Sequence, residues 1–349
     1  MTETFLNRRF LFYPVLLLTF LFCFDKLFSL ESIRKYTESR PEFTFYDCKK
    51  KLLQQLLEFQ NTRTAEQKLL VLFGTSHMGE FSNQYIKEKE PTWETYNFSA
   101  PMAPPSYLFY NLDLILKSKV KIDYAVLEII PETLREEANE YALKFSYDAK
   151  FMFAYRNNFS KEEIEMYIKA NLFSMSRYPA KMKTIIDRMS SSESRFKFSF
   201  FNEKVNEAVK KNNGGIPNPI LYEMTEEKFE KESELFFRQI FTQYKESETQ
   251  KFFFKEFLRV AKENKIRLLI FKPLVSKQLY DKQKNFEPYN RSWSDKVDFA
   301  KEKFAPVLDV ELYRPFIECK KFVDVHHLSG GCYPEITDIL IPKLKSDKQ

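Results

Sequence analysis

The sequence predicts an α/β fold with a central parallel sheet. Three short apolar runs have the character of buried strands: KLLVLF at Lys68–Phe73, YAVLEII at Tyr124–Ile130 and IRLLIFKPLV at Ile266–Val275. They alternate with helical stretches such as FFFKEFLRVAKEN, a pattern typical of strands that helices cover on both faces. We therefore expect a sheet of about five parallel strands. The 349 residues leave room for an insertion as well.

The N-terminal segment contains a longer apolar run, FLFYPVLLLTFLFCF at Phe10–Phe24. These fifteen residues reach only about 22 Å as a helix, so crossing the roughly 30 Å hydrocarbon layer needs the following Leu27–Leu30 or a thinner bilayer. We interpret residues 1–30 as a membrane anchor. A cleaved signal peptide, although no A-x-A-like site follows, and a buried core helix are the alternatives. Basic residues flank the run on both sides and leave its orientation open.

The rest of the chain divides by composition. Residues 31–66 are polar and helix-like, with paired leucines in Lys50–Phe59, and we interpret them as a helical stalk. Residues 67–344 form the predicted α/β domain. Within it, residues 140–245 carry long charged helical stretches, broken by NNGGIPNP at Asn212–Pro219. This region is a helical insertion, either a lid or a packing subdomain.

Composition excludes several classes of function. The 55 basic and 49 acidic side chains are interspersed, so the net charge of +6 does not predict a nucleic-acid partner. No CxxC pair or His/Cys spacing indicates a metal site, and we expect no cofactor. For Cys319 and Cys332, the spacing leaves two alternatives open: a disulfide, if their compartment is oxidising, or two unpaired buried thiols.

The scarce residues of the chain gather in two stretches. VLFGTSHMGEF, Val71–Phe81, and FVDVHHLSGG, Phe322–Gly331, together hold all three histidines and four of the six glycines. The first follows a predicted strand, and ligands of α/β sheets usually bind beyond the carboxyl ends of the strands. This concentration predicts a functional site.

Ser76, Asp324 and His327 are the catalytic candidates. A serine hydroxyl is a poor nucleophile unless a base takes its proton. His77 is adjacent in sequence and would point away from Ser76, so His327 is the expected base. Asp324 lies three residues before His327, where its carboxylate can orient the imidazole. Taken singly, Ser76 also fits an ordinary turn, and D-x-x-H spacing occurs by chance.

These residues carry a resemblance to a known family. Gly74-Thr75-Ser76 after a strand and Asp324-x-x-His327 near the C-terminus resemble the first and last blocks of the SGNH (GDSL-like) hydrolases, over roughly residues 67–344. The single anchor, the long gap between blocks and DVHHLS resemble their membrane-anchored branch. That branch includes the bacterial DUF1574 proteins, the D-alanyl-lipoteichoic-acid protein DltD and alginate O-acetylation proteins.

The resemblance implies a flavodoxin-like three-layer fold, with the domain outside the cytoplasm, in the periplasm, and an N-terminal transmembrane helix. It also implies that Asn97 and the PMAPP turn correspond to the oxyanion-hole block, with Met102 in place of the family's glycine. Thr75 and His77 complete the expected substrate- or oxyanion-binding group. VLEIIPE offers Glu128 and Glu132 but no asparagine where many members have one.

Three functions follow as hypotheses. The first is a serine esterase or O-acyltransferase that acts on a cell-envelope polysaccharide or lipid. The second is an inactive accessory or assembly protein that partners a membrane-bound O-acyltransferase. The third, a purely structural anchored domain, leaves the coincidence of serine, aspartate and histidine unexplained.

Overall fold

The computed structural model describes residues 8–37, 43–135, 139–242, 244–302 and 305–346. Residues 1–7 of the predicted anchor and 38–42 of the predicted stalk lie outside the described residues. The same holds for three short stretches of the predicted α/β domain, at 136–138, 243 and 303–304.

A five-stranded parallel sheet forms the centre of the molecule, which confirms the predicted α/β class. The strands are β1 (Lys68–Phe73), β2 (Trp93–Asn97), β3 (Tyr124–Glu128), β4 (Arg267–Lys272) and β5 (Val307–Asp309). Their order is β2-β1-β3-β4-β5, and all neighbours run parallel. This is the order of flavodoxin-like doubly wound sheets, in which the chain changes direction across the sheet between β1 and β3.

Alternate side chains of each strand enter two hydrophobic layers, so helices cover both faces. In β1, Leu69, Val71 and Phe73 join one layer, while Leu70 and Leu72 join the other. Successive side chains of a strand point to opposite faces, so a strand buried on both sides is apolar throughout. The first layer includes α4 (Lys49–Thr62), α7 (Pro105–Lys117) and α15 (Glu248–Glu263). The second includes α6 (Asn83–Lys89), α16 (Lys277–Gln283) and α18 (Tyr333–Lys345).

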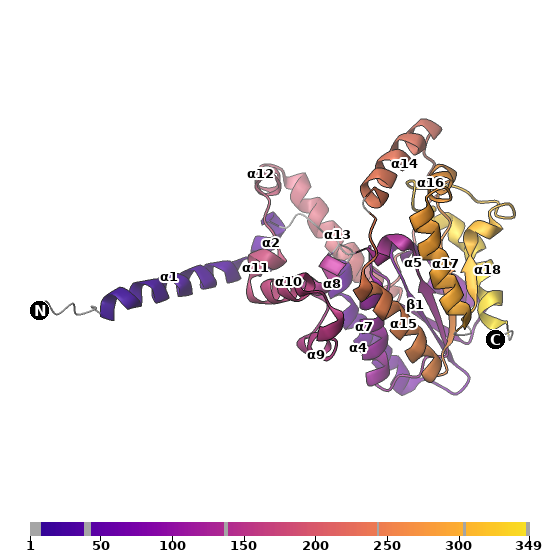
Figure 1. Ribbon diagram of the computed structural model, residues 1–349, viewed down its shortest axis with the longest axis horizontal. Helices are drawn as coiled ribbons and strands as arrows, with labels where there is room; N and C mark the ends of the chain where they lie inside the picture. Colours follow the sequence, from indigo (N-terminus) through magenta and orange to yellow (C-terminus); the bar gives the residue numbers. More distant parts are fainter. Residues whose placement is uncertain (1–7, 38–42, 136–138, 243, 303–304, 347–349) are drawn as a thin grey trace, which may run out of the picture.

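The connection between β3 and β4 is mainly helical over residues 140–245. Its helices are α8 (Glu140–Phe145), α9 (Ala149–Ala154), α10 (Lys161–Leu172), α11 (Ser174–Arg177), α12 (Met182–Ser190), α13 (Ser192–Lys211) and α14 (Glu226–Phe241). After β4, α16 and α17 (Glu287–Glu302) lead to β5. Figure 1 shows α10–α13 gathered at one end of the sheet domain and α14 standing above it.

The predicted stalk is partly packed against the sheet domain. Helix α4 places Leu52 and Leu56 fully inside the first hydrophobic layer, because its paired leucines recur at helical spacing. This half of the segment therefore contributes to the core. The shorter helices α2 (Glu31–Thr37) and α3 (Phe43–Asp47) precede it.

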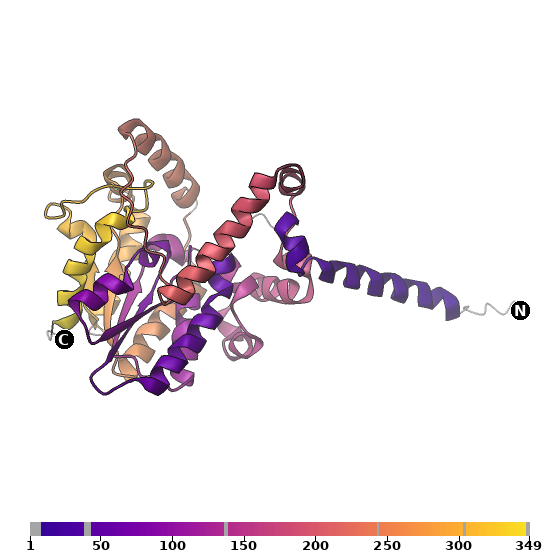
Figure 2. The ribbon, with the colours of Figure 1, turned by 180° about the vertical axis from the view of Figure 1, so that it is seen from behind.

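Helix α1 (Arg8–Leu27) projects away from the rest of the molecule in both ribbon views (Figures 1 and 2). Within the described part of the chain, no single helix is long and apolar enough to cross a membrane. Phe12–Leu27 and Glu31–Thr37 meet that requirement only as a pair, with a bend of 78° between them.

Candidate active site

Ser76 lies just beyond the carboxyl end of β1. The strand ends at Phe73, and Ser76 is the first residue of the short helix α5 (Ser76–Gly79). In a doubly wound sheet of this order, ligands bind where the strand order reverses, between β1 and β3. Ser76 therefore occupies the expected place for a site, and its side chain is half-buried.

Glycine at position 74 leaves room for two neighbouring side chains. A Cβ at this position would lie 2.3 Å from the Met78 side chain and 2.4 Å from Glu128 Oε2. The absence of a side chain thus allows the end of β3 to approach the turn. The close approach of Glu128 is the reason that the structure gives for glycine at this position.

His327 and Asp324 come from a closed loop after β5. Phe322 and Leu328 pair across its base as an antiparallel bridge. Within the loop, Asp324 Oδ1 accepts the backbone N–H groups of His326 and His327, each at 2.8 Å. These bonds fix the aspartate side chain against the backbone that carries both histidines.

The two sequence motifs meet in the order that nucleophilic chemistry requires. Ser76 Oγ lies 2.6 Å from His327 Nε2, and His327 Nδ1 lies 2.9 Å from Asp324 Oδ2. With a proton on Nδ1 donated to the carboxylate, Nε2 has its lone pair free to accept the Ser76 proton. The structure thus brings together Ser76, His327 and Asp324, although 251 residues separate the serine from the histidine.

Burial raises the pKa of the Asp324 carboxyl, but hydrogen bonds and the charge of His327 outweigh burial and hold that pKa well below its usual range. Asp324 is therefore ionised at neutral pH. An ionised carboxylate stabilises the imidazolium that forms when His327 takes a proton.

A second, fully buried pair lies directly behind these residues. His77 Nδ1 lies 2.7 Å from Glu128 Oε1, and the Thr75 hydroxyl donates to the same oxygen at 2.8 Å. The Thr75 N–H donates to Glu128 Oε2, and His77 Nε2 faces the His326 carbonyl oxygen at 3.0 Å. Glu128 thereby holds the serine turn at the end of β3, and His77 links this turn to the histidine loop.

Electrostatics make this pair ionic. Burial disfavours charge on both groups, but their mutual attraction outweighs it: the pKa of His77 is raised and that of Glu128 is lowered. The sequence singled out Glu128 only as a departure from the family pattern. A lone carboxylate ending an otherwise apolar strand was the available signal.

His326 is neutral, and its buried ring lies between Glu132 and Phe236. Burial and the nearby charge of His77 lower the pKa of His326 to about 4. Among the described residues, its Nε2 has no hydrogen-bond partner and lies 3.7 Å from Glu132 Oε1. Its ring packs against Phe236 of α14, with the ring centres 4.9 Å apart.

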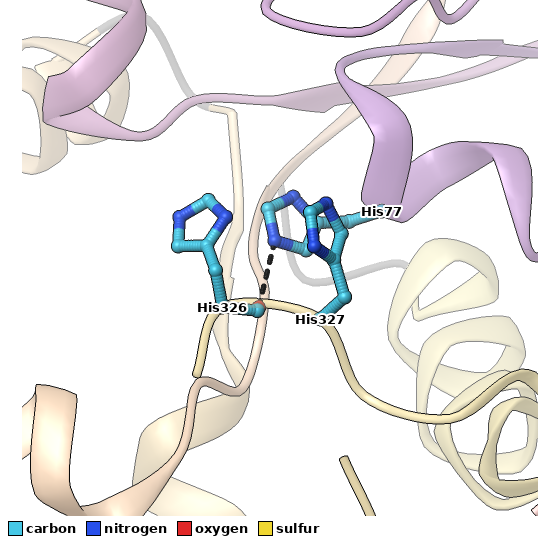
Figure 3. Close-up of side chains that lie close together, drawn as sticks. All are labelled: His77, His326 and His327. Carbon is cyan, nitrogen blue, oxygen red and sulfur yellow. Dashed lines mark hydrogen bonds between the residues drawn. The ribbon is translucent and has the colours of Figure 1, made fainter. Parts of the chain in front are cut away.

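The three histidines form a compact cluster, shown in Figure 3, in which one ring nitrogen of each residue lies within 4.8 Å of those of the other two. Such a group has the composition of a metal site. However, both nitrogens of His77 and both of His327 already face oxygen atoms of the protein. An ion would have to displace these contacts, so the donor set fits a hydrogen-bonded cluster better than a metal site.

The expected oxyanion residues have other partners. Asn97 is fully buried; its Nδ2 donates to the Met78 carbonyl at 2.6 Å and its Oδ1 accepts from the Ser99 N–H. Thr75 and His77 are also committed to internal bonds, as described above. Met102 has a left-handed backbone with φ of 56° and a half-exposed side chain, and no hydrogen bond of the described residues joins it to Ser76.

The helical insertion contacts the site at two places. The segment between α13 and α14 runs along it: the Asn218 N–H donates to Glu80 Oε2, and the Tyr222 N–H donates to Ser329 Oγ. Phe236 of α14 is the second contact, through His326. The insertion therefore borders the histidine loop instead of packing wholly apart from it.

A disulfide between Cys319 and Cys332 encloses the histidine loop. Closing a loop of this length stabilises a protein by about 3 kcal/mol. We expect Cys319→Ser combined with Cys332→Ser to lower the free energy of unfolding by about that amount, measured by urea denaturation. Adding a reductant should destabilise the wild type and leave the double variant unchanged. An equal response of both proteins would contradict a role for this bond.

Fold and site together define a class: an α/β protein with a doubly wound parallel sheet and a serine–histidine–aspartate cluster at its switch point. Residues 5–344 match the family model described as "Protein of unknown function (DUF1574)". Because this match spans nearly the whole chain, the protein belongs to the DUF1574 family. A comparison with curated proteins finds no match.

Proposed function

We propose that this protein is a membrane-anchored serine esterase or O-acyltransferase of the SGNH type, acting outside the cytoplasm on a cell-envelope polysaccharide or lipid. The observation that carries the proposal is the 2.6 Å contact between Ser76 Oγ and His327 Nε2, with Asp324 on the other ring nitrogen. The flavodoxin-like strand order and the position of Ser76 after β1 support the SGNH assignment. The substrate class rests on the family resemblance.

In this mechanism, Ser76 Oγ attacks the carbonyl carbon of an ester while His327 Nε2 accepts the hydroxyl proton. The tetrahedral intermediate collapses, and His327 returns the proton to the departing alcohol. An acyl-Ser76 ester remains. A water molecule or a second hydroxyl group then attacks this ester, again with His327 as the base. The bond between the acyl carbon and Ser76 Oγ breaks, Ser76 Oγ takes the proton back from His327, and the free acid or the new ester is released.

A fluorophosphonate probe tests the nucleophile. It should label the folded protein at Ser76, identified by the mass of the modified peptide, because an activated serine attacks phosphorus while a solvent-exposed one does not. His327→Ala should abolish labelling. Ser294→Ala, which removes an exposed serine hydroxyl on α17, should leave labelling unchanged.

Absence of labelling in the folded wild type would favour the second function, an inactive accessory protein that partners a membrane-bound O-acyltransferase. One observation favours this alternative. The Asn97 amide, expected to help stabilise an oxyanion, is occupied by Met78 and Ser99. Loss of such a donor typically costs about 10²–10³ in turnover.

The anchor and the compartment belong to the same proposal. The apolar side chains of α1 between Phe12 and Leu27 are largely exposed, and a projecting helix with such a surface needs a covering such as lipid. The Cys319–Cys332 disulfide supports an oxidising compartment. Protease added to intact spheroplasts should digest the domain from residue 43 onward, and full protection would place it in the cytoplasm.

A further inference from the structure

Helix α12 carries an exposed apolar stripe. Met182, Ile186 and Met189 follow helical spacing and are 71%, 58% and 69% exposed. The helix is attached to the molecule by another side, because the buried Arg188 donates to the Lys35 carbonyl oxygen of α2 at 3.0 Å. The contact with α2 is therefore made by a different face of α12 from the one that carries the stripe.

A second exposed apolar group lies at the junction of α10 and α11. Leu172, Phe173 and Met175 are each about half exposed. This junction is fixed to the end of α1, because the Asp25 carboxylate accepts the backbone N–H groups of Ser174 and Met175 at 2.6 and 2.9 Å. Lys26 also donates to the Leu172 carbonyl oxygen.

These two groups occupy one end of the molecule. Figures 1 and 2 show α11 and α12 at the end from which α1 projects, in views from opposite sides. We call the six side chains the basal patch: Leu172, Phe173, Met175, Met182, Ile186 and Met189. Exposed lysines at positions 181 and 183 flank Met182 within it.

We propose that the basal patch lies in the headgroup region of the bilayer that α1 enters, and so seats the domain on the membrane. This inference rests on the proposed membrane anchor. Interfacial helices place apolar side chains at the boundary of the acyl chains and lysines among the anionic headgroups. The Asp25 contacts hold the α10–α11 half of the patch beside the end of the apolar helix, and Arg188 holds α12 to the following helix α2. A membrane that contains α1 therefore has its surface at this patch. A bilayer is thus favoured over a protein partner.

The test uses the full chain reconstituted in vesicles of phosphatidylcholine with a minor fraction of phosphatidylglycerol. In Ile186→Trp, the introduced indole should lose fluorescence when the lipids carry bromine near the headgroup end of their acyl chains. Asp187→Trp is the matched control: the neighbouring exposed position points to the polar side of α12 and should lose little. The wild-type protein, which has two tryptophans of its own, gives the background level of quenching.

Flotation with the vesicles tests the membrane anchor separately from the lipid contact of the basal patch. If the chain does not float with the vesicles, the anchor fails and the seating of the patch fails with it. If the chain floats but both introduced indoles respond equally weakly, the anchor stands and the basal patch does not contact lipid. Quenching of Ile186→Trp that vanishes when α12 also carries Met182→Glu and Met189→Glu would support the proposal further.

Discussion

Replacement of Ser76 by alanine is expected to reduce hydrolysis of an activated ester such as p-nitrophenyl acetate by roughly 10⁴-fold or more. His327→Ala should cause a loss of similar size, because nucleophile and base act as a unit. The double variant should then be no worse than either single one. The measurement is the steady-state rate of p-nitrophenol release by purified protein in detergent, with the unfolding transition of each variant recorded beside it.

Asp324→Asn should cause a smaller loss than either of these changes. Its Oδ1 still accepts the two backbone N–H groups of the loop, so the loop keeps its shape, but the neutral amide no longer stabilises the imidazolium. Ser294→Ala is the matched control and should retain full activity. If Ser76→Ala retains the rate of the wild type, any hydrolysis arises elsewhere, and the accessory function becomes the better explanation of the site.

The sheet was predictable because its strands are buried on both faces. Because a strand such as β1 is apolar on both faces, its first and last residues are clear in the sequence. The predicted range Lys68–Phe73 is the observed one. The strand β5 has only three residues and was not singled out, since so short a segment has no distinctive periodicity. The packing of α4 was also missed. Its leucines indicated an amphipathic helix but could not indicate what covers them.

The contact between Ser76 and His327 could be predicted from the sequence for a different reason. Histidine and glycine are so scarce in this chain that their concentration in two stretches was informative. The carboxyl ends of parallel strands meet at one edge of the sheet, which allowed both stretches to be placed together. The role of each residue in catalysis remains a prediction, and the labelling and kinetic experiments address it.

Hydrogen-bond partners that depend on side-chain orientation could not be predicted from the sequence. Asn97 and Thr75 were expected to face a substrate, yet both bond to the protein interior. Whether an amide or hydroxyl points inward depends on neighbours that are distant in sequence, here Met78 and Glu128. The same limit hid the bond between His77 and Glu128, which are 51 residues apart.

The buried pair of Glu128 and His77 is expected to make a large contribution to the stability of the fold. Glu128→Gln should lower the free energy of unfolding by about 3 kcal/mol or more, because it leaves a buried imidazole without its counter-charge. Urea denaturation in detergent measures the change. Glu165→Gln is the matched control, since it breaks an exposed pair with Lys169 on α10 and should cost about 0.5 kcal/mol or less.

The pH dependence of this loss identifies its cause. Because the pKa of Glu128 is lowered in the folded protein, its ionised carboxylate stabilises the fold at pH values above the ordinary pKa of 4.5. That stabilisation is lost as the pH falls through the lowered pKa. The raised pKa of His77 stabilises the fold below the ordinary value of 6.5 and loses its effect as the pH rises through the raised pKa. The destabilisation by Glu128→Gln should therefore be greatest between 4.5 and 6.5 and smaller at alkaline pH. A loss that stays the same from pH 4.5 into the alkaline range would mean that Glu128 acts through packing and neutral hydrogen bonds, without an ion pair to His77.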